Sequence, residues 1–421
     1  EVGYILGHCH PRLALVDDAN AALFDAAPAA EKPPRLTLTA LDGLIESTAP
    51  VPDAGRSGND PASLFYTGGT TGRAKGVVMT HANHIVNGLA LWAGLGVDTG
   101  RARYLHVAPM FHVADALFVH ALTLVGGCHV VVPRFEPVET MRAIERHRIT
   151  DTILVPTMIQ ALLDAPVRAD FDLTSLERMY YGAMPMPEAT ARRLIDALPH
   201  CGPVQLYGQT EAGPVITMLK PVDHDIGGVT RRIRSAGQPL PGVEIAICGK
   251  DGAFLAEGEI GEIVARSGGV MPGYWEDAEQ SAAALKDGWL QTGDGGYIDA
   301  DGFLYIADRV KDMIVSGGEN VYSIEVERAI TLHPAVSQCA VIGLPDARWG
   351  ERVHAIVVPR AGAVVDDAAL VAHCREHIAG YKCPRSIEWR STPLPLSGAG
   401  KILKRELREE ALRRLLAAAE N

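Results

Sequence analysis

Apolar residues recur along this chain with two different periods, and the two periods alternate. Short runs with the pattern of a β-strand occupy residues 63–66 and 77–79, on either side of a glycine-rich stretch. Strands that alternate with helices through short loops predict an α/β fold with a parallel sheet. That alternation continues with expected strands at 104–108, 128–133 and 151–155, and expected helices at 113–125, 137–147 and 157–164.

The later part of the chain changes character twice. Glycine turns separate strand-like runs at 243–248, 261–265 and 296–306, which predicts a β-rich subdomain at about residues 235–308. The large domain is therefore expected at 1–308, with residues 25–62, rich in Ala, Pro, Asp and Gly, as a linker. Residues 309–421 predict a small α+β domain, with helices at 323–332, 366–379 and 404–419 and strands at 336–343, 352–358 and 386–390.

Composition narrows the class of protein. The 421 residues are 47% apolar and 21% charged, which is typical of a globular protein of about two to three domains. A net charge of −12 without a basic block argues against nucleic acid as a partner. No apolar run approaches the ~20 residues that a transmembrane helix needs. The seven cysteines lack CxxC spacing, which argues against a cysteine zinc site and for a reducing, cytoplasmic location.

The glycine-rich stretch carries the first chemistry. Residues 66–76 read Tyr-Thr-Gly-Gly-Thr-Thr-Gly-Arg-Ala-Lys-Gly. A glycine-rich bend exposes backbone N–H groups, threonine hydroxyls add neutral donors, and Lys75 adds a positive charge, so the stretch predicts a phosphate site. No Ser or Thr follows Lys75, so the stretch is not a P-loop; a glycine-rich surface turn is the alternative. The residues expected to bind phosphate are Thr67, Gly68, Gly69, Thr70, Thr71, Gly72 and Lys75.

This stretch resembles the phosphate-binding signature of the adenylate-forming superfamily, with Gly68 and Ala74 where the common form has Ser and Pro. The superfamily includes AMP-dependent acyl- and aryl-CoA synthetases, among them fatty acyl and 4-coumarate-type CoA ligases, peptide-synthetase adenylation domains and luciferases. The resemblance implies a large domain of mixed and parallel sheets, and a small C-terminal domain that rotates about a hinge at Lys311. A whole N-terminal subdomain precedes position 1 in that family, so the large domain is expected to lack it. Further motifs follow in the family's order at 207–211, 288–294, 308–320 and 395–407.

The resemblance also implies the reaction, in which a carboxylic acid and ATP give acyl-AMP and pyrophosphate, and CoA then takes the acyl group. Bringing two anions together requires a cation, a metal and neutral donors. By resemblance, Lys401 is the catalytic lysine, Thr210 contacts the α-phosphate and Glu211 holds Mg²⁺. His112, beside the acyl pocket, is expected to guard the channel or orient the carboxylate. A solvated lysine, a surface acid and a core histidine are the alternatives.

The resemblance assigns further residues to the nucleotide. Tyr207 is expected to stack on the adenine. Asp294, expected in a turn after Trp289, has two carboxylate oxygens that suit the ribose hydroxyls, and Arg309 is its partner near ribose and phosphate. The residues expected around the adenine are Gly182, Ala183, Met184, Tyr207 and Gly208.

The same resemblance implies that CoA binds to the C-terminal part of the chain. Gly317 and Gly318 belong to a loop that is expected to line the pantetheine tunnel in the second half-reaction. Trp349 is expected to stack on the nucleotide of CoA, because an indole offers a broad apolar face. The basic residues expected near the phosphates are Arg348, Arg352 and Lys382.

The acid is the least defined substrate. The expected pocket is small or apolar, which predicts an uncharged aliphatic or aryl acid and argues against an amino acid. Two other functions stay open: an adenylating enzyme that loads a carrier protein, and a non-catalytic protein that binds acyl-AMP or a nucleotide. The sequence also leaves a homodimer open. The residues expected in the pocket are Val113, Ala114, Tyr181, Gly182, Gly208, Val215 and Ile216.

Overall fold

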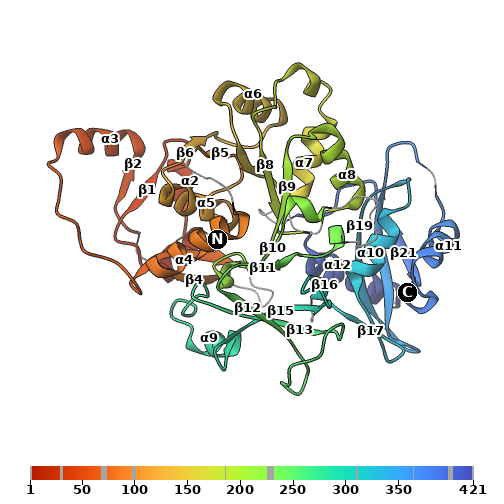
Figure 1. Ribbon diagram of the computed structural model, residues 1–421. Coiled ribbons are helices and arrows are strands. Elements are labelled where there is room, and N and C mark those ends of the chain that lie inside the picture. The colour runs from red at the N-terminus through yellow and green to blue at the C-terminus, as the bar shows by residue number, and fades with distance from the viewer. Residues whose placement is uncertain are drawn as a thin grey trace. The chain divides into compact units, whose positions relative to one another are not determined.

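The computed structural model describes residues 2–28, 32–67, 74–96, 101–184, 186–224, 232–309, 312–363, 365–396 and 402–419, without the side chains of Arg309 and residues 416–419. The chain divides into two compact units (Figure 1). The first unit holds Glu1–Ala82 and Met271–Ser281, and the second holds Asn83–Val270 and Ala282–Asn421. Within the described ranges, no helix combines the length and the apolar character that crossing a bilayer requires.

The first unit contains the strands that flank the glycine-rich stretch. They form the antiparallel hairpin of β3 (Pro61–Thr67) and β4 (Lys75–Thr80), which confirms both predicted strands. The linker expected at 25–62 is wrong in part, because it contains a strand and a helix, β2 and α3. The Thr37 hydroxyl caps α3 by accepting the Ala40 N–H at 3.2 Å. The linker was predicted from residue composition, which does not reveal a helix cap of this kind. The remaining elements are α1 (Val2–Cys9), β1 (Ala14–Val16), α2 (Ala21–Ala26), β2 (Arg35–Thr37), α3 (Leu38–Ser47) and α9 (Ala278–Ala284), which continues into the second unit.

The second unit begins with a seven-stranded sheet in the order β11–β10–β9–β8–β7–β5–β6. The strands from β9 to β6 run parallel, as the alternating pattern predicted, and β10 and β11 join them in antiparallel fashion at one edge (Figure 1). The sheet is therefore mixed, with a parallel majority. Its strands are β5 (Arg103–His106), β6 (Cys128–Val131), β7 (Asp151–Ile153), β8 (Arg178–Gly182), β9 (Gly202–Tyr207), β10 (Thr217–Leu219) and β11 (Gln238–Pro239).

Helices cover both faces of this sheet. The neighbouring residues Met179 and Tyr180 of β8 belong to different hydrophobic cores, because successive side chains of a strand point to opposite faces. Tyr180 packs in the core formed with α4 and α5, and Met179 packs in the core formed with α6, α7 and α8. The result is a helix–sheet–helix arrangement. The helices are α4 (His81–Leu95), α5 (Val113–Leu124), α6 (Pro137–His147), α7 (Pro156–Asp164) and α8 (Glu188–Ala197).

A β-rich sheet follows, as predicted for residues 235–308. The strand expected at 296–306 is wrong, because a turn in this range separates the antiparallel strands β15 and β16. The Asp299 side chain accepts the N–H groups of Asp301 and Phe303 and so closes that turn. The strands are β12 (Val243–Cys248), β13 (Gly261–Ser267), β14 (Leu285–Lys286), β15 (Trp289–Ile298) and β16 (Leu304–Arg309).

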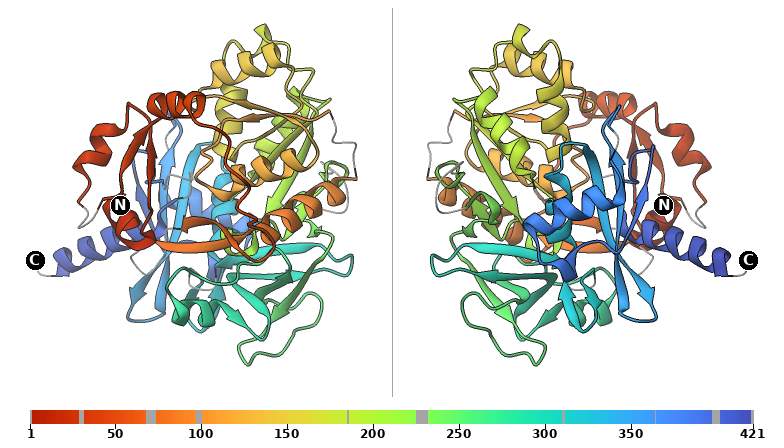
Figure 2. Two further views of the ribbon diagram at one scale, coloured as in Figure 1. Left: turned by 90° about the vertical axis from the view of Figure 1, so that its left-hand side faces the viewer. Right: turned by 90° about the vertical axis from the view of Figure 1, so that its right-hand side faces the viewer.

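The C-terminal part has its own five-stranded sheet, with β20 at its centre. The long antiparallel pair β19–β20 is light blue in Figure 2, and the terminal helix α12 is darker blue. One core of this sheet includes residues of α10 and α11, and the other includes Leu407 and Ala411 of α12. The elements are β17 (Ile314–Ser316), β18 (Glu319–Val321), α10 (Ser323–Thr331), β19 (Val336–Asp346), β20 (Gly350–Pro359), α11 (Asp367–His377), β21 (Ser386–Trp389) and α12 (Lys404–Ala419).

A buried ion pair lies at the start of β7. The Asp151 side chain is fully buried and accepts two hydrogen bonds from the Arg178 guanidinium, at 2.6 and 2.9 Å. The Tyr180 hydroxyl donates to the same carboxylate at 3.0 Å, and the Thr150 hydroxyl donates at 2.5 Å. These hydrogen bonds satisfy the buried carboxylate and tie β7 to β8 through Arg178 and Tyr180.

Candidate active site

The segment predicted to line the adenine lies at the carboxyl end of a parallel strand. Gly182 ends β8, where its Cα pairs with Leu206 of β9. A Cβ added to Gly182 would lie 2.3 Å from the Leu206 carbonyl oxygen, so only glycine fits. Ala183, which follows, has a φ of 64°, a conformation that costs energy for a residue with a side chain. Ligands of open α/β sheets bind outside such strand ends, which agrees with the predicted position.

Two motifs that are far apart in the sequence meet at this edge. The Tyr207 hydroxyl, at the end of β9, donates to the Asp294 carboxylate at 2.9 Å. The Cα of Asp294 also pairs with that of Arg309 on β16, whose side chain lies outside the described residues. The structure thus brings together residues expected at the adenine and at the ribose. Tyr207 is only 9% exposed, and its expected stacking on adenine stays a prediction.

The turn expected around Asp294 is wrong, because this residue lies inside β15. The strand carries an irregularity there: the pairing with β13 shifts register, and Gly293 has a φ of 71°. The Thr292 hydroxyl donates to the Ile263 carbonyl at 2.6 Å and accepts the Asp294 N–H at 3.1 Å. A bulge of this kind re-aims a side chain, and here the Asp294 carboxylate faces Tyr207.

The loop after β9 carries the residues predicted to serve the α-phosphate and the metal. Gly208 directly follows the strand, and Thr210 and Glu211 lie in a single turn of 3₁₀ helix, Thr210–Ala212. Both side chains are half-buried. A carboxylate is a hard oxygen donor that suits Mg²⁺ together with phosphates and water, so Glu211 fits that ion.

His112 lies immediately before α5, where its carbonyl accepts the first helical N–H groups. Its half-buried ring is tilted against the exposed Phe111, with centroids 4.4 Å apart. Val113 and Ala114 follow in the first turn of the helix. Two expected pocket residues thus follow His112 directly, and its role beside the pocket and with the carboxylate stays a prediction.

A buried polar network behind α5 was not predicted. Asp115, fully buried, accepts the Tyr104 hydroxyl at 2.9 Å and lies 2.8 Å from Nδ1 of His106. The other ring nitrogen of His106 lies 2.9 Å from Nδ1 of the exposed His129. Tyr104 and His106 share one face of β5, which sequence alternation indicates, but their link to Asp115 depends on tertiary packing. The network fixes the start of α5, next to His112.

The residues at the base of the predicted phosphate loop belong to the first unit. Thr67 and Lys75 pair with each other across the β3–β4 hairpin. The Lys75 ammonium lies 4.4 Å from the centre of the Tyr274 ring and donates to the Gln280 side chain at 3.3 Å. Tyr274 and Gln280 therefore orient the cation, which sequence analysis did not foresee. The other predicted members, Gly68, Gly69, Thr70, Thr71 and Gly72, lie outside the described residues.

Four of the residues predicted to meet CoA lie together in the C-terminal part of the chain: Gly317, Gly318, Arg348 and Trp349. Gly317 and Gly318 make the tight turn between β17 and β18, with φ angles of 64° and 86° that favour glycine. The Gly317 N–H donates to the Trp349 carbonyl at 2.7 Å, and a Cβ on Gly317 would lie 2.8 Å from the indole. The guanidinium of Arg348 lies 4.7 Å from the centre of the Trp349 ring, and that of Arg385 lies 4.0 Å away.

The other two basic residues predicted near the CoA phosphates are Lys382 and Arg352. Lys382 forms an ion pair with Glu325 at 2.7 Å, so its charge is already neutralised. Arg352 is half-buried on β20. Arg385, which was not among the predicted residues, lies beside Trp349 instead.

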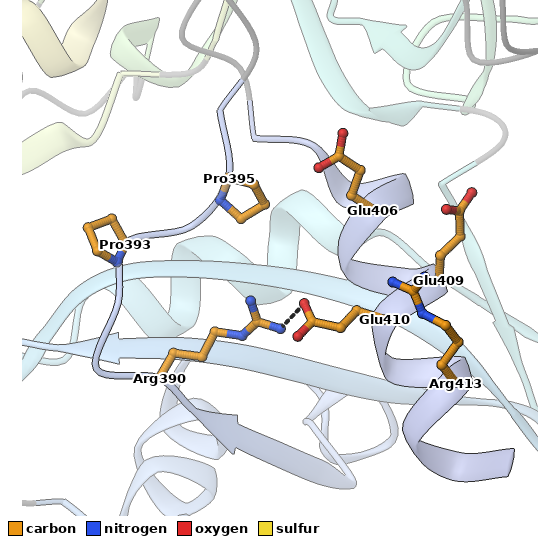
Figure 3. Close-up of a pocket in the computed structure, with 7 residues that line it drawn as sticks. All are labelled: Arg390, Pro393, Pro395, Glu406, Glu409, Glu410 and Arg413. Carbon is orange, nitrogen blue, oxygen red and sulfur yellow. Dashed lines mark hydrogen bonds and ion pairs between the residues drawn. The ribbon is translucent and has the colours of Figure 1, made fainter. Parts of the chain in front are cut away.

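Lys401 lies outside the described residues, but both ends of its segment are fixed. Leu396 and Ile402 form an isolated antiparallel bridge, and the Leu403 N–H donates to the Pro395 carbonyl at 3.0 Å. A hollow of about 440 Å³ lies beside these ends (Figure 3), where Arg390 pairs with Glu410 at 2.6 Å. Among the residues that the structure describes, none of the predicted site residues lines it. Its lining residues are Arg390, Pro393, Pro395, Glu406, Glu409, Glu410 and Arg413.

The expected acyl pocket is divided between the layers of the central sheet. Val215 and the partly buried Ala114 pack in the core formed with α4 and α5. Tyr181 is buried in the opposite core, and its hydroxyl lies 2.8 Å from Nε2 of His224. The placement of Tyr181 in one pocket with Ala114 is therefore wrong, because the strand alternation directs it to the other face.

His224 predicts a pH dependence of stability. Its Nδ1–H donates to the Lys220 carbonyl at 2.8 Å and its Nε2 accepts from Tyr181, so the folded imidazole is neutral. Burial lowers the pKa of His224 to about 4, from an unfolded value of about 6.5. The unfolded chain takes up this proton first, so the stability from this group is present above pH 6.5 and is lost as the pH falls towards 4.

We expect this group to remove about 3 kcal/mol of stability between pH 6.5 and pH 4. Urea unfolding followed by circular dichroism should show that the pH dependence is shallower in His224→Gln, whose amide can serve both partners. The exposed His200 offers a control, and His200→Gln should keep the slope of the wild type. Equal slopes in all three proteins would contradict the assignment.

Comparisons with known proteins cover nearly the whole chain. The sequence model of the AMP-binding enzyme family matches residues 1–275, and that of the AMP-binding enzyme C-terminal domain matches residues 325–401. Gly182, Tyr207, Thr210 and Glu211 fall in the first match and Trp349 falls in the second, whereas Asp294 and Arg309 lie between the two.

Individual relatives and solved structures point to the same family as the two sequence models. A feruloyl-CoA synthase of an Amycolatopsis species is 41% identical over 354 residues, covering 83% of this chain and 70% of the relative. The medium/long-chain-fatty-acid–CoA ligase FadD8 of Mycobacterium tuberculosis is 41% identical over 354 residues, covering 82% of this chain but 60% of the relative. The crystal structure of ATP-bound MatB from Rhodopseudomonas palustris matches with a TM-score of 0.86 at 28% identity, covering 97% of this chain and 81% of that one.

Proposed function

Because this chain belongs to the AMP-binding enzyme family, we propose that it is an AMP-forming ligase that joins a carboxylic acid to CoA. The observation that carries the proposal is the hydrogen bond between Tyr207 and Asp294 at the carboxyl ends of β8 and β9. It unites two motifs at the sheet edge where this fold class binds nucleotides. The names of the relatives, a feruloyl-CoA synthase and a fatty-acid–CoA ligase, support the overall reaction.

In the first half-reaction, a carboxylate oxygen of the acid attacks the α-phosphorus of ATP. The new bond gives acyl-AMP, and the bond to the bridging oxygen breaks so that pyrophosphate leaves with the electron pair. Asp294 would hold the ribose, Thr210 would donate to the α-phosphate, and Lys401 would stand between the two anions. Mg²⁺, held by Glu211, would supply charge neutralisation on the phosphates.

In the second half-reaction, the thiolate of CoA attacks the acyl carbon of acyl-AMP, and AMP leaves. The group around Trp349 supports CoA as the acceptor, because an indole and two guanidinium groups suit a base and phosphates. The Gly317–Gly318 turn packs against the same indole and would face the pantetheine arm. We place the boundary between the domains, 1–308 and 309–421, at the hinge residue Lys311, which lies outside the described residues.

The acid would be uncharged and aliphatic or aryl, since Val113, Ala114 and Val215 are apolar and the last two pack in one core. A carrier protein in place of CoA is the second candidate acceptor. A cytoplasmic location is part of the same proposal, because it agrees with seven scattered cysteines, all of them free thiols. For the assembly, the proposal includes a homodimer.

The test is an assay of the two half-reactions on a panel of fatty and aryl acids. We expect pyrophosphate release that requires ATP and an acid, and multiple-turnover AMP release that requires CoA as well. AMP release that needs an acyl carrier protein and ignores CoA would support the second acceptor. No pyrophosphate release with any acid would overturn the ligase and favour a nucleotide-binding protein.

Glu211→Gln should raise the Mg²⁺ concentration needed for half-maximal acyl-AMP formation, by about tenfold or more, because a hard cation prefers a charged oxygen. The amide keeps the shape of the carboxylate, so the thermal unfolding midpoint should stay near that of the wild type. A Mg²⁺ titration of pyrophosphate release measures the effect. An unchanged titration would move the metal site away from Glu211. Glu257→Gln, an exposed acid in the β-rich part, is the control.

A further inference from the structure

The helix α11 of the C-terminal domain ends in a group of side chains that the ligase reaction does not use. His373, Glu376 and His377 occupy positions i, i+3 and i+4 of this helix, which places them on one side of it. One potential ligand atom of each residue lies within 4.8 Å of those of the other two. Two imidazole nitrogens and a carboxylate oxygen are a donor set that zinc prefers.

The fold holds this side of the helix towards solvent. Leu370 and Cys374 of α11 are fully buried in the core of the C-terminal domain, so the helix cannot rotate about its axis. His373 is then half-buried, and Glu376 and His377 are exposed. The helix ends at His377, and the unpaired carbonyl groups of a last helical turn favour a cation.

The half-buried histidine has the kind of support that metal ligands have. Nε2 of His373 lies 3.1 Å from the carbonyl oxygen of Ala329 on α10. With its proton on Nε2, the neutral ring has a lone pair on Nδ1, and a carbonyl partner of this type is usual behind a metal-binding histidine.

A third histidine in contact with this group is excluded as a ligand. The His333 ring lies edge-on to that of His373, with centroids 5.0 Å apart. However, Nδ1 of His333 accepts the Ala335 N–H at 3.2 Å. Its proton is then on Nε2, so neither nitrogen has a lone pair to offer while that hydrogen bond lasts.

We propose that His373, Glu376 and His377 bind one Zn²⁺ ion, or a similar first-row transition-metal ion, with water in the remaining position. Imidazole ligands favour zinc over Mg²⁺, so this site is distinct from the magnesium site assigned to Glu211. The ion would connect three side chains of the last turns of α11. Through His373, which is bonded to the Ala329 carbonyl, it would also hold that end of α11 against α10. Zinc would therefore stabilise the C-terminal domain, independently of the acid that the enzyme activates.

The test uses the full chain, treated with EDTA, desalted and titrated with zinc chloride in a calorimeter at pH 7. We expect one Zn²⁺ per chain at this site and a thermal unfolding midpoint that rises with zinc but not with magnesium chloride. His377→Asn should weaken this binding by at least about tenfold, and Glu376→Gln should weaken it less. Both residues are exposed, so circular dichroism should show an unchanged fold.

The matched control is His333→Asn, because the amide oxygen can still accept the Ala335 N–H while the ring is removed. It should bind zinc with the affinity of the wild type. Three results would each overturn the proposal: no zinc binding by the wild type, unchanged binding by His377→Asn, or an equal loss in His333→Asn and His377→Asn.

Discussion

Lys401→Ala is expected to slow acyl-adenylate formation by about a hundredfold or more, because in the proposed mechanism Lys401 is the cation between the carboxylate and the α-phosphate. The second half-reaction joins a thiolate to an already activated acyl group, so thioester formation from supplied acyl-AMP should remain close to the wild type. Single-turnover assays of each half-reaction, with the same acid, measure the two effects.

The segment around Lys401 makes this variant interpretable. The contacts of Pro395, Leu396, Ile402 and Leu403 fix both ends of the segment without its side chain. The fold should therefore survive the substitution, and a thermal unfolding scan checks this. Lys250→Ala removes an exposed lysine from the β-rich part and should leave both half-reactions unchanged. An equal loss in the two half-reactions of Lys401→Ala would refute its assigned role.

Asp151→Ala is expected to destabilise the chain by about 3–5 kcal/mol, the largest stability effect that we anticipate. The side chain of Arg178 is only 11% exposed, and the substitution leaves its guanidinium without its two strongest hydrogen bonds. The Tyr180 and Thr150 hydroxyls lose their acceptor as well. Urea unfolding, followed by the near-ultraviolet signal of the aromatic residues, measures the change.

The same arginine supplies the control. Glu177 also pairs with Arg178, at 3.2 Å, but its side chain is 61% exposed. Solvent screens such a pair, so Glu177→Ala should cost no more than about 1 kcal/mol. Comparable losses in the two variants would show that burial is not what makes Asp151 important.

The sequence predicted the features that depend on local patterns. The alternation of strands and helices between residues 104 and 164 is confirmed, as are the family and the α/β class, because periodicity and ordered motifs are properties of short segments. The turn expected around Asp294 was wrong for the same reason. A Thr-Gly-Asp sequence favours a turn locally, but pairing with β13 and β16 holds it in a bulged strand.

Contacts between distant segments could not be predicted in this way. The bond between Tyr207 and Asp294 joins residues 87 positions apart, and the Asp115–His106 pair depends on how α5 packs on β5. Nor could the sequence show that Lys382 is neutralised by Glu325 while Arg385 lies over Trp349. Lys382 and Arg385 carry the same charge, so only the three-dimensional structure shows which of them lies beside Trp349.

Tyr207 has one further consequence, for how the central sheet and the β-rich sheet unfold. Its backbone belongs to β9 of the central sheet, whereas its ring packs in the core of the β-rich sheet, with Ile263 and Leu290. Its hydroxyl is bonded to Asp294 of that second sheet. Neither sheet can then lose its order without exposing a side chain on which the other depends, so the two should unfold in one cooperative transition. A nucleotide bound at Asp294 would raise the midpoint of that single transition, since it binds only where both sheets are intact.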